Sequence, residues 1–205
     1  MRIKICGITN KEDANNAVSL GADALGFIFY PNSPRYIHPD IVEEIAMFLP
    51  PFILLVGVFV NQDINDIKRI SNQCRLDLIQ LHGEESTTTC LDIKKRVIKS
   101  IRVSEPDDLT IIPQYQGAVS AILLDTKVPG MPGGTGQTFD WGLALNAKDY
   151  DIPLILSGGI NSNNIDKAIT LVNPYAIDLS SGVEKEPGIK DYQKMQSVIE
   201  KVKQF

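Results

Sequence analysis

The chain has 205 residues, of which 43% are hydrophobic and 22% charged, and a formal net charge of −5 at pH 7. This size and composition are typical of a globular protein with a substantial core, and the acidic balance argues against nucleic-acid or anionic-membrane partners. Three cysteines, Cys6, Cys74 and Cys90, lack the CxxC spacing of zinc or redox sites, which favours a reducing, cytoplasmic setting. The amino terminus does not resemble a signal peptide, and the longest apolar stretch, residues 52–60, is too short to span a bilayer.

Apolar runs typical of strands alternate along the chain with segments of helical periodicity. The predicted strands are Ile3–Cys6, Ala24–Phe29, Ile53–Val60, Leu76–Leu81, Val97–Ile101, Ala121–Asp125, Leu154–Leu156 and Tyr175–Leu179. The predicted helices are Lys11–Leu20, Pro39–Leu49, Ile64–Gln73, Ser86–Lys95, Pro106–Tyr115, Asp140–Ala147, Asn163–Val172 and Ile189–Lys203.

Eight apolar strands, each followed by a helix, predict a parallel sheet that is covered by other elements. Eight such units in 205 residues match the lower size limit of a (β/α)8 TIM barrel, and no Pro/Gly/Ser-rich linker divides the chain. We therefore expect one α/β domain, residues 1–205, folded as a single (β/α)8 barrel. An open, doubly wound sheet is the alternative, but eight strands of one type close more naturally than they spread.

Reactive side chains end two of the predicted strands, Cys6 the first and Asp125 the sixth. The carboxyl ends of parallel strands carry the chemistry in α/β proteins, so we expect both residues on one rim of the barrel. A group that takes a proton and a group that gives one suit general acid–base catalysis. Asp125 follows an apolar run, where desolvation favours the neutral acid, and Cys6 precedes a helix start, whose dipole favours a thiolate.

The loops after the seventh and eighth predicted strands are rich in glycine and serine. The first contains Ser157-Gly158-Gly159 and the second contains Ser180-Ser181-Gly182. Glycine lets backbone N–H groups approach an anion, serine hydroxyls add donors, and barrel enzymes frequently bind phosphate at these two loops. Two tight turns without a ligand are the plainer explanation, but their occurrence in both expected repeats favours a phosphate site.

Three further features of the loops give weaker indications. Arg35, near two stiffening prolines, suits a bound carboxylate, although an isolated arginine is more often simply solvated. The glycine-rich segment 129–136 lacks the spacing of a nucleotide loop and predicts a lid over the site, with a plain solvent loop as the alternative. The two histidines, His38 and His82, are too few for a multi-histidine metal centre, so no metal site is predicted.

Short segments from the first strand to the last match one family in order and number. They are Lys4–Thr9, Ser33–Tyr36, Gly57–Asn61, Gln80–Gly83, Leu123–Asp125, Gly133–Gly136 with Phe139–Trp141, Leu156–Ile160 and Asp178–Glu184. Together they resemble phosphoribosylanthranilate isomerases, the (β/α)8 enzymes of tryptophan biosynthesis. Each segment is weak alone, and their number makes the resemblance specific.

The resemblance implies an Amadori rearrangement of the aminoaldose N-(5-phosphoribosyl)anthranilate to 1-(o-carboxyphenylamino)-1-deoxyribulose 5-phosphate, with no redox cofactor or metal. It implies that Asp125 is the general acid and Cys6 the general base. Arg35 is then expected to contact the anthranilate carboxylate, and Asp178 to orient the ribulose chain. The expected partner is a phosphosugar substrate, bound by a cytoplasmic monomer or homodimer with no nucleic-acid or membrane partner.

Three other functions are weighed against this one. An aminoaldose isomerase of histidine biosynthesis shares the reaction type, but that family carries aspartate where this chain has Cys6. Indole-glycerol-phosphate synthase would need a set of strand-end lysines and glutamates that the sequence does not have. A non-catalytic phosphate-binding barrel gives no reason for an acid and a thiol on one rim. His82 is the first alternative base if Cys6 only packs.

Overall fold

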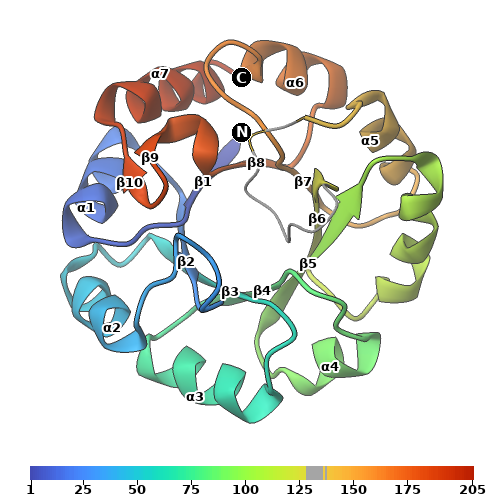
Figure 1. The fold of residues 1–205 in the computed structure, drawn as a ribbon. Coiled ribbons are helices and arrows are strands. Elements are labelled where there is room, and N and C mark those ends of the chain that lie inside the picture. Colours follow the sequence, from blue (N-terminus) through green and yellow to red (C-terminus); the bar gives the residue numbers. More distant parts are fainter. Residues whose placement is uncertain (128–135, 137) are drawn as a thin grey trace.

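The computed structural model describes residues 1–127, 136 and 138–205, in which eight parallel strands close into a barrel ringed by helices (Figure 1). β1 pairs with β2 on one side and with β8 on the other, which confirms the predicted (β/α)8 barrel and rules out the open sheet. The strands are β1 (Arg2–Cys6), β2 (Ala24–Ile28), β3 (Leu54–Phe59), β4 (Leu78–Leu81), β5 (Arg96–Val103), β6 (Ala121–Thr126), β7 (Leu154–Leu156) and β8 (Ala176–Leu179).

The helices between the strands follow the predicted order, with shorter bounds in the second half of the chain. They are α1 (Lys11–Leu20), α2 (Pro39–Phe48), α3 (Ile64–Gln73), α4 (Thr87–Asp92), η1 (Pro106–Tyr115), α5 (Gly142–Ala147), α6 (Ile165–Val172) and α7 (Tyr192–Lys203). The segment η1 is a 3-10 helix, and Pro113 within it has no N–H to donate to an α-helical hydrogen bond. Among the described residues, no helix is both long and apolar enough to cross a membrane.

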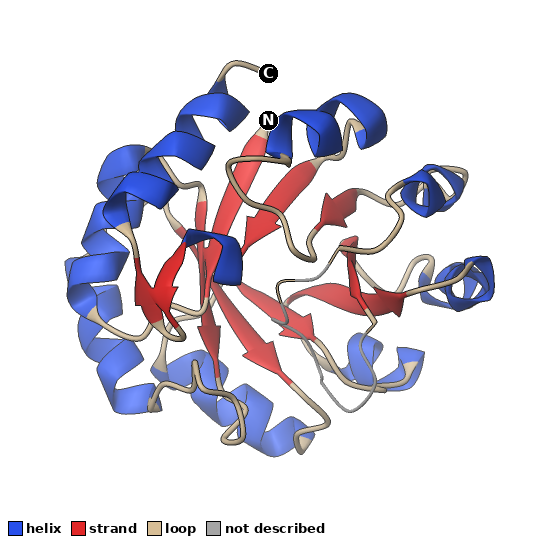
Figure 2. Ribbon diagram, turned by 45° about the horizontal axis from the view of Figure 1, so that its top comes forward, coloured by secondary structure: helices blue, strands red, loops and turns tan. Residues whose placement is uncertain are grey.

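A short hairpin precedes the last helix and was not predicted. We expected a helix from Ile189, but Ile189–Lys190 forms strand β10, which pairs antiparallel with β9 (Glu184–Glu186). Gly188, at a φ of +86°, turns the chain between the two strands, and α7 begins only after Asp191, whose side chain accepts from the N–H of Lys194. Figures 1 and 2 show this hairpin beside the short 3-10 helix η2 (Ser181–Val183) that follows β8.

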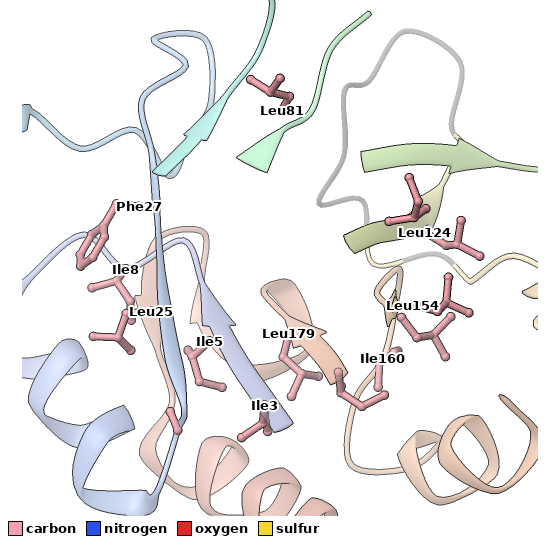
Figure 3. Packing of buried hydrophobic residues seen from close by; sticks show 14 of the residues in the cluster. Ile3, Ile5, Ile8, Leu25, Phe27, Leu81, Leu124, Leu154, Ile160 and Leu179 are labelled. Carbon is pink, nitrogen blue, oxygen red and sulfur yellow. The ribbon is translucent and has the colours of Figure 1, made fainter. Parts of the chain in front are cut away.

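Each barrel strand buries one face against the helices and the other inside the barrel. On β1, Ile3 and Ile5 point outward into the core between barrel and helices (Figure 3), so Lys4 and Cys6 point inward. The interior holds a separate apolar cluster: Ala24, Val56, Leu78, Ile98, Ala121, Leu123, Ile155 and Ala176. Four of these eight residues are the first of their strands, so the cluster fills the amino-terminal end and leaves the carboxyl end for polar side chains.

Candidate active site

A pocket opens at the carboxyl ends of the strands, and every site residue predicted from the sequence lines it. These residues are Cys6, Arg35, Asp125, Gly158, Gly159, Asp178, Ser180, Ser181 and Gly182. Gln80 from β4 and His82 just after it, together with apolar side chains of β2 and β3, also line the pocket. The closed barrel therefore brings the first, sixth, seventh and eighth strand ends to one place, as the barrel geometry requires.

Cys6 is packed tightly at the end of β1, with 5% of its surface exposed. Its sulfur occupies the space beside Gly26 on the neighbouring strand β2: a Cβ at Gly26 would lie 2.6 Å from Sγ of Cys6 and 2.9 Å from Cε of Lys4. The carbonyl oxygen of Cys6 accepts from Nζ of Lys190 at 2.5 Å. Gly26 therefore provides the room in which the thiol and Lys4 lie together.

Burial dominates the acidity of this thiol. Desolvation raises the pKa of Cys6 above its ordinary value, the carboxylate of Asp178 raises it further, and the cations of Lys4 and Lys190 oppose the rise. A nearby helix start was expected to favour the thiolate, but the thiol is buried and α1 begins only at Lys11. Burial therefore favours the neutral thiol of Cys6 over its thiolate.

Lys4 lies inside the barrel, one inward position before Cys6, and sequence analysis did not assign it a role. Its Nζ donates to Oε1 of Gln80 at 2.7 Å and forms an ion pair with Oδ1 of Asp178 at 2.8 Å. All three side chains are at least 94% buried. Both residues could have been predicted from the alternation of side chains along a strand. This alternation places Lys4 on the same face as Cys6, and Gln80 on the same face as His82.

Asp125 is the penultimate residue of β6, enters the pocket from a different strand than Cys6, and is 6% exposed. Its Oδ1 accepts from the N–H of Thr126 at 2.9 Å, and its Oδ2 lies 3.3 Å from Nε2 of His82. A Cβ at Gly158 would come within 3.2 Å of Oδ1, so this glycine lets the β7 loop pass close to the carboxyl group. His82 is therefore in contact with the predicted acid and lines the pocket beside it.

Arg35 is directed into the pocket by an ion pair that sequence analysis did not foresee. Nε and Nη2 grip the carboxylate of Glu184 in β9, with distances of 2.8 Å from Nε to Oε1 and 2.7 Å from Nη2 to Oε2. Lys190 in β10 binds the same carboxylate at 2.8 Å. The chain carries Arg35 across Gly7, at a φ of +76°, where a Cβ would lie 2.7 Å from Cδ of the arginine. Arg35 is thus 7% exposed rather than solvated, and its Nη1 donates to no described residue.

The charges around Glu184 hold that carboxyl group ionised. Burial alone would raise the pKa of Glu184, but the hydrogen bonds and charges of Arg35 and Lys190 outweigh it and hold the pKa below its ordinary value. Burial lowers the pKa of Lys190, and Glu184 opposes that shift. The hairpin β9–β10 therefore supplies a carboxylate, Glu184, that pairs with Arg35, and an ammonium group, Lys190, that pairs with the same carboxylate. Glu184 belonged to a recognised sequence segment, but nothing in the sequence indicated which residue it pairs with.

The two predicted phosphate loops touch each other at the pocket. A Cβ at Gly182 would lie 1.9 Å from the carbonyl oxygen of Ile160, so only glycine permits this approach. Gly158 and Gly159 have φ values of +85° and +64°, and their N–H groups donate to no other described residue. The hydroxyl of Ser180 is buried without a hydrogen-bond partner among the described residues. Unpaired donors beside a pocket are what a bound anion would satisfy.

Two further sequence predictions concern the loop after β6 and metal binding. The predicted lid, residues 129–136, lies outside the described residues except for Gly136, which lines the pocket. Across residues 1–127, 136 and 138–205, no three His, Cys, Asp or Glu side chains are grouped so that they could hold a metal ion.

Comparison with known proteins gives one consistent family. The family described as N-(5'-phosphoribosyl)anthranilate isomerase matches residues 3–201. An N-(5'-phosphoribosyl)anthranilate isomerase of Geobacter sp. strain M21 is 46% identical over 204 residues, which cover 100% of this chain and 98% of that protein. A crystal structure of the Thermotoga maritima enzyme superposes with a TM-score of 0.94 at 45% identity, with both chains fully covered. Another phosphoribosylanthranilate isomerase structure is a complex with reduced 1-(o-carboxyphenylamino)-1-deoxyribulose 5-phosphate. It superposes with a TM-score of 0.91 at 43% identity, again over the full length of both chains.

Proposed function

This chain belongs to the N-(5'-phosphoribosyl)anthranilate isomerase family, and we propose that Cys6 and Asp125 carry its proton transfers. The enzyme converts N-(5-phosphoribosyl)anthranilate to 1-(o-carboxyphenylamino)-1-deoxyribulose 5-phosphate in tryptophan biosynthesis. The reaction moves hydrogen within one molecule and so converts an aminoaldose to an aminoketose. It therefore needs one protein group that donates a proton to the substrate and one that accepts a proton from it.

Asp125 is the proposed general acid. Its proton goes to the ring oxygen of the furanose while the bond between C1 and that oxygen breaks, and the nitrogen lone pair forms the C1–N double bond of a Schiff base. The side chain fits this step because it points into the pocket from β6, with Oδ1 fixed by the N–H of Thr126. His82 lies beside Oδ2 and holds the carboxyl group in one orientation.

Cys6 is the proposed general base. Its thiolate removes the proton from C2, and the electron pair of that C–H bond forms the C1–C2 double bond while the imine nitrogen becomes neutral. The resulting enolamine then tautomerises to the ketone, which is the product. The thiol lines the same pocket as Asp125 but comes from β1, so the two groups can act on different atoms of one ribose.

The remaining proposed roles concern binding. The N–H groups of Gly158 and Gly159, with Ser180, Ser181 and Gly182 of the next loop, hold the 5-phosphate. Arg35 meets the anthranilate carboxylate through Nη1, because Nε and Nη2 are already engaged by Glu184. Asp178 orients the ribulose chain from the floor of the pocket.

One observation carries these assignments: a thiol and a carboxyl group share a pocket whose rim holds unpaired backbone and hydroxyl donors. The direct test incubates the purified protein with freshly made phosphoribosylanthranilate and follows formation of the aminoketose. Conversion that is lost in both Cys6→Ala and Asp125→Asn supports the roles. Turnover at the wild-type rate in either variant removes that residue from the chemistry.

We also propose where the enzyme is located and how it assembles. All three cysteines are free thiols and buried, which fits a reducing compartment, and we place the enzyme in the cytoplasm. It acts there as a monomer or homodimer, which sedimentation at micromolar concentration distinguishes. Sedimentation as a larger assembly would contradict this expectation.

A further inference from the structure

Lys4 sits in the barrel interior beside Cys6 and has no part in the proton transfers described above. Its side chain is 5% exposed, and its Nζ is held between Oε1 of Gln80 at 2.7 Å and Oδ1 of Asp178 at 2.8 Å. These three residues come from β1, β4 and β8, so the ammonium group is fixed from three sides of the barrel. Burying a charged lysine costs folding free energy unless the charge is paired with an anion or hydrogen-bonded.

The sulfur of Cys6 is the third neighbour of this ammonium group. Sγ of Cys6 and Cε of Lys4 both border the space that Gly26 leaves empty, at 2.6 Å and 2.9 Å from the position of an added Cβ. Lys4 and Cys6 occupy successive inward positions of β1, so the ammonium group and the sulfur lie on one face of the strand, where the lysine's charge opposes the rise in the pKa of the thiol. Gly26 therefore brings together a nucleophilic atom and a cation that would otherwise be separated by a side chain.

We propose that Lys4 is a positioning residue that holds a positive charge against Cys6 and stabilises its thiolate during the isomerisation. The inference rests on the proposed role of Cys6 as general base. An anionic sulfur in this pocket has little access to water, so its charge must be balanced by the protein. When the thiolate takes the C2 proton of the substrate it becomes neutral, and Lys4 keeps Asp178 as its counter-ion.

The other charges that face Cys6 do not replace Lys4. Asp178, from β8, disfavours a thiolate, while Lys190, from β10, donates to the carbonyl oxygen of Cys6 and is paired with Glu184. Burial lowers the pKa of Lys4, but Asp178 and Cys6 outweigh it and hold the pKa above its ordinary value, which favours the charged ammonium group. Gln80 adds an uncharged acceptor that prevents Nζ from turning toward Asp178 alone.

The simpler alternative is that Lys4 only neutralises Asp178. The alkylation rate of Cys6 in the free protein separates the two, because iodoacetamide is uncharged and reacts with the thiolate. The Cys6 peptide is quantified by mass spectrometry, so Cys74 and Cys90 do not contribute. A unit charge at about 4 Å is worth more than one pKa unit at an effective dielectric constant of about 20, and each unit changes the thiolate fraction about tenfold. Lys4→Met should therefore slow alkylation at pH 8 about tenfold or more.

Two further variants control this measurement. Asp178→Asn keeps Lys4 but removes the carboxylate that competes with the sulfur for it, so alkylation of Cys6 should become faster. Lys99→Met removes another buried lysine, on β5, which pairs with Glu85 at 2.9 Å and shares no partner with Cys6, so alkylation should not change. Combining Lys4→Met with Asp178→Asn isolates the effect of Lys4 on the sulfur, because the carboxylate is absent from both proteins that are compared. Alkylation should still be slower in this double variant than in Asp178→Asn alone.

An unchanged rate in Lys4→Met, or equal rates in Asp178→Asn and in the double variant, overturns the inference. The outcome is separable from that of the proposed base. If Cys6→Ala keeps its turnover while Lys4→Met slows alkylation, the base assignment fails and the ion pair stands. If Cys6→Ala is inactive but the alkylation rates do not respond to Lys4, the base stands and its cation lies elsewhere.

Discussion

Gln80 donates from Nε2 to Nδ1 of His82 over 3.0 Å, and the direction of this hydrogen bond is set by Lys4. The ammonium group of Lys4 can only donate, so it fixes Oε1 of Gln80 as the acceptor and turns the amide nitrogen toward His82. Nδ1 of His82 then accepts, which leaves the proton on Nε2, the atom that faces Asp125 at 3.3 Å. A continuous set of polar contacts thus joins the side of the proposed base to the side of the proposed acid.

Replacing Gln80 with leucine should break this set of contacts without removing either proton-transfer group. His82 would be free to take its other tautomer, and Lys4 would lose one acceptor. We expect kcat to fall roughly tenfold, about the effect of one hydrogen bond to a charged group. Nitrogen NMR of His82 should report a mixed tautomer in the variant and a proton on Nε2 in the wild type. A single unchanged tautomer in the variant would contradict the role of Gln80.

Cys6→Ala and Asp125→Asn should each lower turnover by about 10² to 10⁴-fold while leaving the fold and ligand binding intact. Cys6→Ala removes a single sulfur atom and Asp125→Asn keeps the volume of the side chain, so each substitution costs little packing. The measurements are kcat with phosphoribosylanthranilate, thermal unfolding, and the affinity for a reduced product analogue. Cys90→Ala, a buried thiol outside the pocket, is the matched control and should keep kcat. Should Cys6→Ala remain active, the base must be sought at His82.

The pH profile of kcat/KM should be a bell whose alkaline limb follows Cys6. The productive enzyme carries one proton on the acid and none on the base, which is one proton for the pair. Because burial raises the pKa of Cys6, the pair loses its last proton when pH rises through that raised value, and activity falls there. Cys6→Asp should keep some activity and move the alkaline limb to lower pH, since a carboxyl group ordinarily titrates well below a thiol. An alkaline limb that does not move would assign it to another group.

Arg35→Ala should mainly weaken binding, because its proposed partner is a carboxylate remote from the reacting atoms. If that contact is equal in ground and transition states, KM rises and kcat holds. Arg69→Ala, an exposed arginine of α3, serves as the control and should change neither constant. A collapse of kcat at constant KM would instead place Arg35 in the chemical step.

Gly182→Ala should weaken phosphate binding by forcing the two phosphate loops apart. The added Cβ would lie 1.9 Å from the carbonyl oxygen of Ile160, so the backbone must shift. We expect a higher dissociation constant for inorganic phosphate, whereas Gly142→Ala, outside the pocket, should leave it unchanged. A crystal structure with sulfate or phosphate should place the anion near Gly158, Gly159, Ser181 and Gly182. Density confined to residues 133–136 would contradict the assignment.

The order of the barrel strands and helices, the closed barrel, and the positions of Cys6, Asp125 and the two glycine-rich loops followed from local features of the sequence. Apolar runs define the strands, their regular alternation with helices implies a parallel sheet, and a reactive residue at a strand's carboxyl end is carried to the rim by that topology. The positions of Cys6 and Asp125 at the rim could be predicted without knowing the rest of the structure, because the carboxyl ends of all strands meet at one rim whatever side chains fill the barrel. The glycines of the phosphate loops were equally visible, since their positions after β7 and β8 are fixed by the repeat.

The partners of the charged residues were decided only by the tertiary structure. Arg35 and Glu184 are 149 residues apart in the chain, and Lys4 and Gln80 are 76 apart, so no local pattern could pair them. The hairpin that carries Glu184 and Lys190 is too short to leave a periodic signal. The acidity of Cys6 depends on how deeply the thiol is buried and on which cations surround it, both of which result from packing. Sequence periodicity determined which face each side chain occupies, whereas closure of the barrel decided which charges meet, because contacts across the interior exist only once all eight strands are in place.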